Sequence, residues 1–116
     1  MNAAEALLHA GPLVDDLTAS LGWKRAFAER AVLEYLTAPT WPEDDPRWLH
    51  HLVEVVQEQV HEDRVDTAWP QCPRHSGHPL WLEESAGPEL WWSCRTDRTR
   101  IAPLGGLAAA HGGAVE

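Results

Sequence analysis

The sequence lacks an apolar run near the roughly 20 residues that a membrane-spanning helix needs. Its first residues, "MNAAEALLHAG", have no basic stretch ahead of an apolar one, so they do not match a secretory signal. A phosphate-binding glycine loop is also missing, because "LGGLAAAHGG" has neither the lysine nor the strand-to-helix context of such a loop. These absences predict a cytoplasmic protein with no membrane partner.

Basic residues are scarce. The chain has 9 lysines and arginines against 18 acidic residues, a formal net charge of −9. This balance argues against a general nucleic-acid binder, because binding to phosphate depends on positive side chains. The charge is uneven: residues 1–66 hold thirteen acidic and five basic residues, and residues 67–116 hold five and four. The acidity therefore belongs to the N-terminal half.

Cysteine is scarce as well, with only Cys72 and Cys94 in 116 residues. This length predicts one domain. In the cytoplasm the two cysteines fit thiols or metal ligands better than a disulfide, although the sequence leaves a disulfide open.

Four helices are predicted in the first 66 residues. Asn2 and Glu5 match a capping box that begins a helix over about 3–10, and Pro12 can begin a second helix that ends near Gly22. A third helix is expected over about 23–37. Asp45-Pro46 predicts the start of a long helix that runs to about residue 65.

One face of the long helix is apolar and the other is polar. Its apolar stripe is expected to face the core, and the face with His50, Glu54, Glu58, His61 and Glu62 is expected to be solvated. The residues of the stripe are Trp48, Leu49, Leu52, Val53, Val56 and Val60.

After residue 66 the pattern changes, because four prolines at 70, 73, 79 and 88 exclude long helices. Short apolar runs at 80–82, 90–94 and 100–104 predict strands, and "EESAG" predicts a hairpin loop. The predicted fold class is α+β: a single domain, 1–104, with an N-terminal bundle of three or four helices in 1–66 and a zinc-ribbon-like β-hairpin module in 67–104. Residues 105–116 are expected to form a flexible tail.

Within this module, Cys72-x2-His75 is followed after eighteen residues by Cys94-x2-Asp97. A zinc ribbon has a similar design, with two short turns that each offer a pair of ligands to one tetrahedral ion. The fourth ligand is open: Asp97 fits the spacing, whereas His78 fits the chemistry, because imidazole is common in structural zinc sites. A module this small cannot bury a large core, so it needs another source of stability such as a bound metal ion.

The segments "WPQCPRHSGHPLW", "WWSC" and "IAPLGGL" resemble a group of small, mostly uncharacterised actinobacterial proteins. Their C-terminal segment has the form W-P-x-C-P-x-H, H-P-L and W-x-C, and the resemblance covers about residues 67–107. It implies a zinc-ribbon-like element at Cys72, His75, His78 and Cys94, and it brings no activity. One departure is Arg95, which stands where such segments commonly have proline.

These features predict a non-catalytic protein that binds a structural Zn²⁺ ion. Two thiolates and two further protein ligands close the coordination shell and leave no position for a substrate. A nucleophilic cysteine paired with a histidine is conceivable, but no oxyanion-hole segment accompanies it. An interaction or regulatory role follows, with an unidentified protein partner that docks on the acidic helices.

The alternative function is nucleic-acid binding by the C-terminal module. Its possible contacts are Arg74, Arg95, Arg98 and Arg100, which cluster around the proposed metal site. These arginines could equally pair with the glutamates at 83, 84 and 89.

The seven tryptophans are unusual for this length. Trp91 and Trp92 are adjacent, so in a strand they must face opposite sides. The favoured interpretation is a seam that joins the module to the long helix, and an exposed aromatic patch is the alternative.

Overall fold

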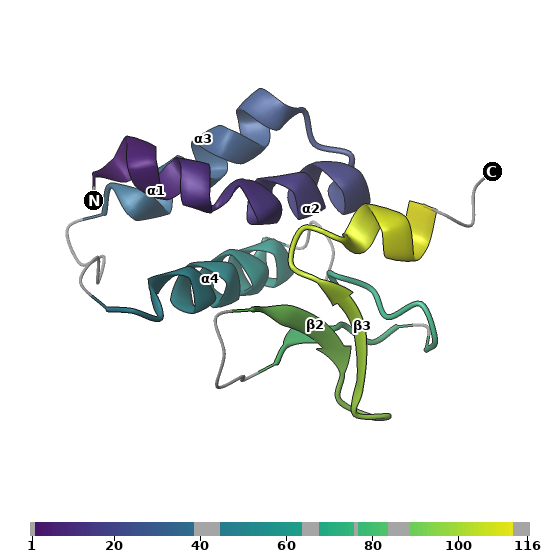
Figure 1. Cartoon of the computed structure of the whole chain (residues 1–116). Helices are drawn as coiled ribbons and strands as arrows, with labels where there is room; N and C mark the ends of the chain where they lie inside the picture. The colour runs from purple at the N-terminus through teal and green to yellow at the C-terminus, as the bar shows by residue number, and fades with distance from the viewer. Residues whose placement is uncertain (1, 39–44, 64–67, 76, 84–88, 113–116) are drawn as a thin grey trace.

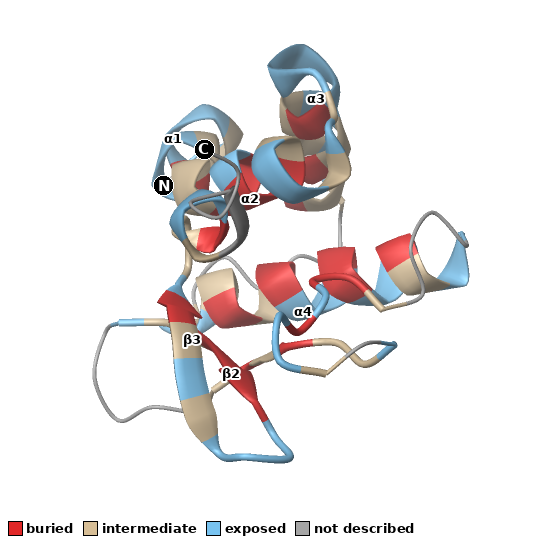
Figure 2. Ribbon diagram, turned by 90° about the vertical axis from the view of Figure 1, so that its right-hand side faces the viewer, coloured by how far each residue is buried: buried red, intermediate tan, exposed pale blue. Residues whose placement is uncertain are grey.

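The computed structural model describes residues 2–38, 45–63, 68–75, 77–83 and 89–112. It has the predicted α+β fold, with helices followed by a three-stranded antiparallel sheet of order β1-β2-β3 (Figure 1). The helix α4 lies between the sheet and a layer formed by α1, α2 and α3 (Figures 1 and 2). The elements are α1 (Ala3–His9), α2 (Gly11–Leu21), α3 (Arg25–Leu36), α4 (Trp48–Glu62), β1 (Trp81–Leu82), β2 (Trp91–Cys94), β3 (Thr99–Pro103) and a short π-helix (Ala108–Gly112).

The first helices begin and end where the sequence signals are. The Asn2 side chain accepts a hydrogen bond from the Glu5 amide at 2.9 Å, and the Glu5 carboxylate accepts one from the Asn2 amide at 3.2 Å. This is the predicted capping box. The second helix ends at Gly22, whose φ of 71° is a conformation that favours glycine.

The long helix α4 begins two residues later than predicted. Asp45 caps a turn instead of the helix, because its side chain accepts a hydrogen bond from the Arg47 amide at 2.8 Å. The helix then runs from Trp48 to Glu62, and the predicted end near residue 65 lies outside the described residues. The polar face was also predicted too broadly, because His50 is buried, with an exposed fraction of 5%.

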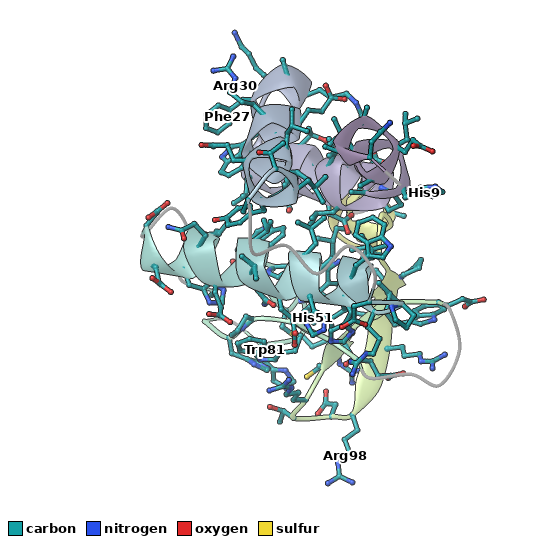
Figure 3. All side chains as sticks on the ribbon, turned by 90° about the vertical axis from the view of Figure 1, so that its left-hand side faces the viewer. His9, Phe27, Arg30, His51, Trp81 and Arg98 are labelled. Carbon is teal, nitrogen blue, oxygen red and sulfur yellow. The ribbon has the colours of Figure 1, made fainter. Side chains whose placement is uncertain are left out.

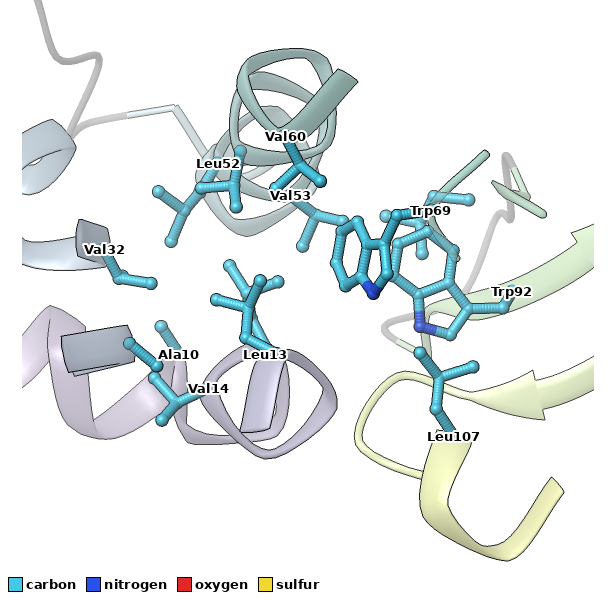
Figure 4. Close-up of a cluster of buried hydrophobic side chains, with 14 of the residues drawn as sticks. Ala10, Leu13, Val14, Val32, Leu52, Val53, Val60, Trp69, Trp92 and Leu107 are labelled. Atoms are coloured by element: carbon cyan, nitrogen blue, oxygen red, sulfur yellow. The ribbon is translucent and has the colours of Figure 1, made fainter. Parts of the chain in front are cut away.

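One hydrophobic core connects the helices to the sheet (Figure 4). At its centre the rings of Trp69 and Trp92 meet edge to face, with centroids 5.7 Å apart. Both are almost fully buried, whereas Trp91 is half-buried on the other side of β2. The seam of tryptophans therefore includes Trp92 but not its neighbour.

The sheet contains a bulge that sets which residues face the helices. Trp92 pairs with Ala102 and Ser93 pairs with Arg100, so Ile101 is an extra residue in β3. The hairpin loop predicted at "EESAG" and the predicted boundary at residues 66 and 67 fall among residues that the structure does not describe.

The predicted flexible tail is wrong for its first residues. Leu107 is fully buried in the core, and the amides of Gly105 and Leu107 donate hydrogen bonds to the Asp16 carboxylate at 2.7 and 3.0 Å. One buried leucine and two amides suffice to hold this segment once the Asp16 carboxylate accepts their hydrogen bonds. In the described part of the chain, every helix is too short or too polar to cross a membrane.

Candidate metal centre

Residues 70–75 and 77–80 form the two sides of a narrow loop that brings three candidate ligands together. Its two sides are joined by a hydrogen bond from the Cys72 amide to the His78 carbonyl at 3.0 Å and by another from the Leu80 amide to the Pro70 carbonyl at 2.6 Å. Gly77 turns the chain back with a φ of 79°. The loop therefore brings the side chains of Cys72, His75 and His78 close together in space.

The fourth candidate ligand comes from the end of β2. One donor atom from each of Cys72, His75, His78 and Cys94 lies within 4.8 Å of the other three. These are the four residues that the sequence favours as ligands, and they come from two separate chain segments. Their convergence is a Cys2His2-type cluster that is compatible with structural metal binding.

Four of the six distances between the donor atoms are close to those around one tetrahedral ion. His75 Nδ1 lies 3.5 Å from the sulfur of Cys72 and 3.5 Å from that of Cys94, and His78 Nε2 lies 3.7 Å from Cys94 Sγ. The two imidazole nitrogens are 3.2 Å apart. Bond lengths of about 2.3 Å to sulfur and about 2.05 Å to nitrogen, at tetrahedral angles, require about 3.6 Å between sulfur and nitrogen and about 3.3 Å between the nitrogens.

The burial of the four residues is uneven. Cys72 and Cys94 are buried, with exposed fractions of 3% and 0%, whereas both histidines are half-buried. The Asp97 amide also donates a hydrogen bond to Cys94 Sγ at 3.5 Å. Both cysteines are free, so the disulfide that the sequence left open is not formed.

Asp97 lies outside the cluster. Its carboxylate faces Nε2 of the candidate ligand His75. Its carboxylate is 3.7 Å from His75 Nε2 and 3.2 Å from Arg74 Nε. Since His75 turns Nδ1 toward the sulfurs, Asp97 is placed to orient the ring from behind, as carboxylates do for metal-bound histidines. Of the two candidates for the fourth ligand, the structure therefore brings His78 to the cluster and leaves Asp97 behind it.

Two side chains of α4 that the sequence analysis did not single out for this role hold the loop in place. The Gln57 amide donates hydrogen bonds to the carbonyls of Trp69 at 3.2 Å and Leu80 at 2.8 Å, and His61 Nε2 lies 2.7 Å from the Trp69 carbonyl. The sequence does offer a signal for Gln57, which directly follows Val56 of the apolar stripe. A buried amide at such a position needs hydrogen-bond partners.

The arginines of the module already have partners within it. Arg74 pairs with Asp97, and the Arg95 guanidinium lies 4.7 Å from the centre of the Trp81 ring. Arg100 binds Glu83 at 2.7 Å, and this hydrogen bond raises the pKa of its guanidinium. Arg98 is exposed in the turn between β2 and β3 and points away from the helices (Figure 3). Three of the four predicted nucleic-acid contacts are thus engaged by the protein itself.

The chain matches no protein-family model, no curated protein and no solved structure. The resemblance to actinobacterial segments therefore stays a prediction, and the function must be argued from the residues of the site.

Proposed function

We propose that the protein is a non-catalytic, cytoplasmic interaction or regulatory protein whose C-terminal sheet is stabilised by a structural Zn²⁺ ion. Cys72, His75, His78 and Cys94 would hold the ion. The observation that carries the proposal is the convergence of the four donor atoms, which lie within 4.8 Å of one another, with four of the six separations close to those of a tetrahedral site.

The donor set favours zinc. Two sulfurs and two nitrogens in a tetrahedral arrangement are typical of zinc, whereas magnesium and calcium prefer oxygen. Four protein donors fill a tetrahedral shell, and a catalytic zinc site keeps one position open for water or substrate. The ion would therefore stabilise the fold and take no part in catalysis.

The sheet needs such an ion. Its strands have only 2, 4 and 5 residues, too few to form a stable hairpin on their own. The cluster joins the loop that carries Cys72, His75 and His78 to the end of β2, so an ion there would add a direct cross-link to the ion pair of Arg74 with Asp97. Small modules commonly rely on a structural metal in this way.

Elemental analysis of the untagged protein tests the proposal. We expect about one zinc per chain, because one set of four donors binds one ion. Replacement with Co²⁺ should give the intense visible absorption of a tetrahedral site, with thiolate-to-metal bands in the near ultraviolet. Folded, metal-free protein would contradict the proposal, as would an octahedral cobalt spectrum.

Two variants separate a ligand from a residue that orients one. His78→Ala leaves three protein donors, so zinc affinity should fall by several orders of magnitude in competition with a chromogenic chelator. Asp97→Asn should cost only about tenfold to a hundredfold, because Asp97 acts through His75. If Asp97→Asn proves the more damaging change, the assignment of the fourth ligand is wrong.

The nucleic-acid alternative finds less support. Arg74, Arg95 and Arg100 would each have to leave a partner before binding phosphate. A mobility-shift assay with single- and double-stranded probes at low salt checks this point, since binding through arginines weakens steeply as salt rises. No shift is expected.

A further inference from the structure

An open groove of about 510 Å³ separates α3 from the C-terminal half of α4 and shares no lining residue with the metal cluster. Most of its surface is apolar or aromatic. Phe27 is the most prominent side chain, because it is 51% exposed while its ring meets Trp23 edge to face at 4.8 Å. The groove is lined by Trp23, Phe27, Ala31, Glu34, Tyr35, Ala38, Val56, Gln59, Val60 and Asp63.

The groove is elongated. On α3 its lining recurs every three or four residues from Phe27 through Ala31 to Tyr35, and on α4 it recurs from Val56 through Val60 to Asp63. Such spacing follows one face of each helix, so the groove runs along the helices for about two turns or more. Figure 3 shows Phe27 on the outer side of α3, projecting away from the core. A second helix fits this shape better than a compact small molecule does.

The charged residues that line the groove, Glu34 and Asp63, are both acidic. They gather at the end near Tyr35, whose pKa is raised first by burial and then by the negative charges of Asp63, Glu34 and Glu62. Arg30 lies close by on α3 but does not line the groove. An apolar floor with an acidic end therefore selects an apolar ligand that carries positive charge.

We propose that this groove binds an amphipathic helix of a partner protein, with apolar residues against Phe27 and Val60 and lysine or arginine beside Glu34 and Asp63. The inference rests on the interaction role proposed above and names its partner class, but it does not depend on the metal. Acidic side chains would repel nucleic acid and anionic lipid. A second copy of this chain would place two acidic ends together, which opposes self-association.

Three designed peptides of about 18 residues, roughly five helical turns, test the proposal. The first is an amphipathic helix with a lysine-rich polar face, the second has the same apolar face with glutamates, and the third has the composition of the first in scrambled order. By fluorescence anisotropy at low salt, the first should bind at least about tenfold tighter than either other peptide. Its affinity should fall as salt rises, because part of the attraction is between exposed charges.

Paired variants then locate the peptide. Phe27→Ser should weaken binding at least about tenfold, whereas Leu8→Ser, at an 80% exposed position on α1, should leave it unchanged. Glu34→Lys should weaken binding several-fold, and Glu58→Lys, on an exposed face of α4 outside the groove, should have a smaller effect. All four positions are exposed, so circular dichroism should show intact helices in every variant.

Several results would overturn the inference. Equal binding of the scrambled peptide would reduce it to unspecific charge attraction, and insensitivity to Phe27→Ser would place the peptide elsewhere. If sedimentation shows a dimer that dissociates on Phe27→Ser, the occupant of the groove is a second copy of the chain. If the protein binds anionic vesicles and Phe27→Ser abolishes this binding, the groove binds a membrane surface. Zinc is measured on the same samples, so a zinc-loaded protein that binds no peptide refutes the groove and leaves the metal centre standing.

Discussion

The helical layer α1–α3 and the β-rich region are stabilised by different means. The three helices have 7, 11 and 12 residues, begin or end with local signals such as the Asn2 capping box, and pack through apolar side chains. The strands of the β-rich region are shorter. Many of the interactions that stabilise this region are made with side chains of the helices. Elements that are locally stable supply the framework on which less stable ones are ordered.

Polar side chains on the helices provide much of this external support. Asp16 and Ser20 on α2 accept hydrogen bonds from the indoles of Trp92 and Trp69 at 2.8 and 2.6 Å, and Gln57 on α4 binds two carbonyls at the ends of the ligand loop. Among the described residues, the side-chain hydrogen bonds from α2 and α4 reach Trp69, Leu80 and Trp92 but not Cys94. The candidate metal cluster includes Cys94.

The largest expected effect is that of metal removal. Chelation, or Cys94→Ser, should free the loop at 70–80 and the strands β2 and β3, because structural zinc sites contribute about 10 kcal/mol or more of binding free energy. Hydrogen exchange should then rise steeply in residues 68–103 and little in α1–α3. Equal exchange in both regions would mean that the shared core unfolds as one unit. The helical layer and the β-rich region would then not differ in how they are stabilised.

The next effect concerns Asp16, which ties the helical layer to the sheet. Asp16→Asn should destabilise the protein by about 2 kcal/mol, since an amide has one acceptor oxygen in place of two and leaves one of the three buried donors unsatisfied. Asp15→Asn is the control, because Asp15 is half-exposed and pairs with Arg25. Urea unfolding of both variants measures the difference.

The same pair of variants has a pH dependence of defined sign. Burial raises the pKa of Asp16, although hydrogen bonds from Trp92, Gly105 and Leu107 act in the opposite direction. The folded state therefore binds this proton more tightly than the unfolded chain, and the stabilising contribution is lost as pH rises through the folded pKa. The cost of Asp16→Asn should fall between acidic and neutral pH; a cost that grows instead would show that the hydrogen bonds dominate.

A smaller effect is expected at Gly105, where the C-terminal segment passes over α2. Its φ is 93°, and an added Cβ would lie 2.9 Å from Pro12 Cβ. Gly105→Ala should cost about 1–3 kcal/mol, from both the conformation and the contact. At Gly11 an added Cβ meets nothing within 4 Å, so Gly11→Ala should be neutral or slightly stabilising in thermal unfolding.

The smallest effect is expected at the far turn of the sheet. Arg98 has a φ of 56°, which costs a residue with a side chain about 1 kcal/mol. Arg98→Gly should therefore raise stability by about 1 kcal/mol or less, and Arg98→Lys should not. If Arg98→Gly is destabilising, the side chain makes an interaction that offsets its backbone conformation.

The sequence predicted the helices and the candidate ligands because their signals are local. Capping residues lie three positions apart, and Cys72, His75 and His78 sit in one short loop. Spacing alone left His78 and Asp97 open, because the choice depends on how the turn after Cys94 is oriented. That orientation follows from the hydrogen bond between the Asp97 amide and Cys94 Sγ, which no residue pattern specifies.

The missed features are long-range. Asp16 reads as one more acidic residue of an amphipathic helix, and its three donors lie 76 to 91 positions later in the sequence. The ordered segment after residue 104 was missed for the same reason, since its only large apolar residue besides Leu104 is Leu107. A buried carboxylate can be identified only once the donors around it are placed.

The separation between Asp16 and Leu107 also sets an order of events during synthesis. At about 5–20 residues per second, the 91 positions between them take roughly 5 to 18 s to translate. During this time α2 has been made and can pack on α1 and α3, while the Asp16 carboxylate has only water to bind. The nascent chain therefore carries a hydrated side chain at the site that later becomes the interior, and Asp16 can be buried with its partners only after Trp92 and Leu107 have been made.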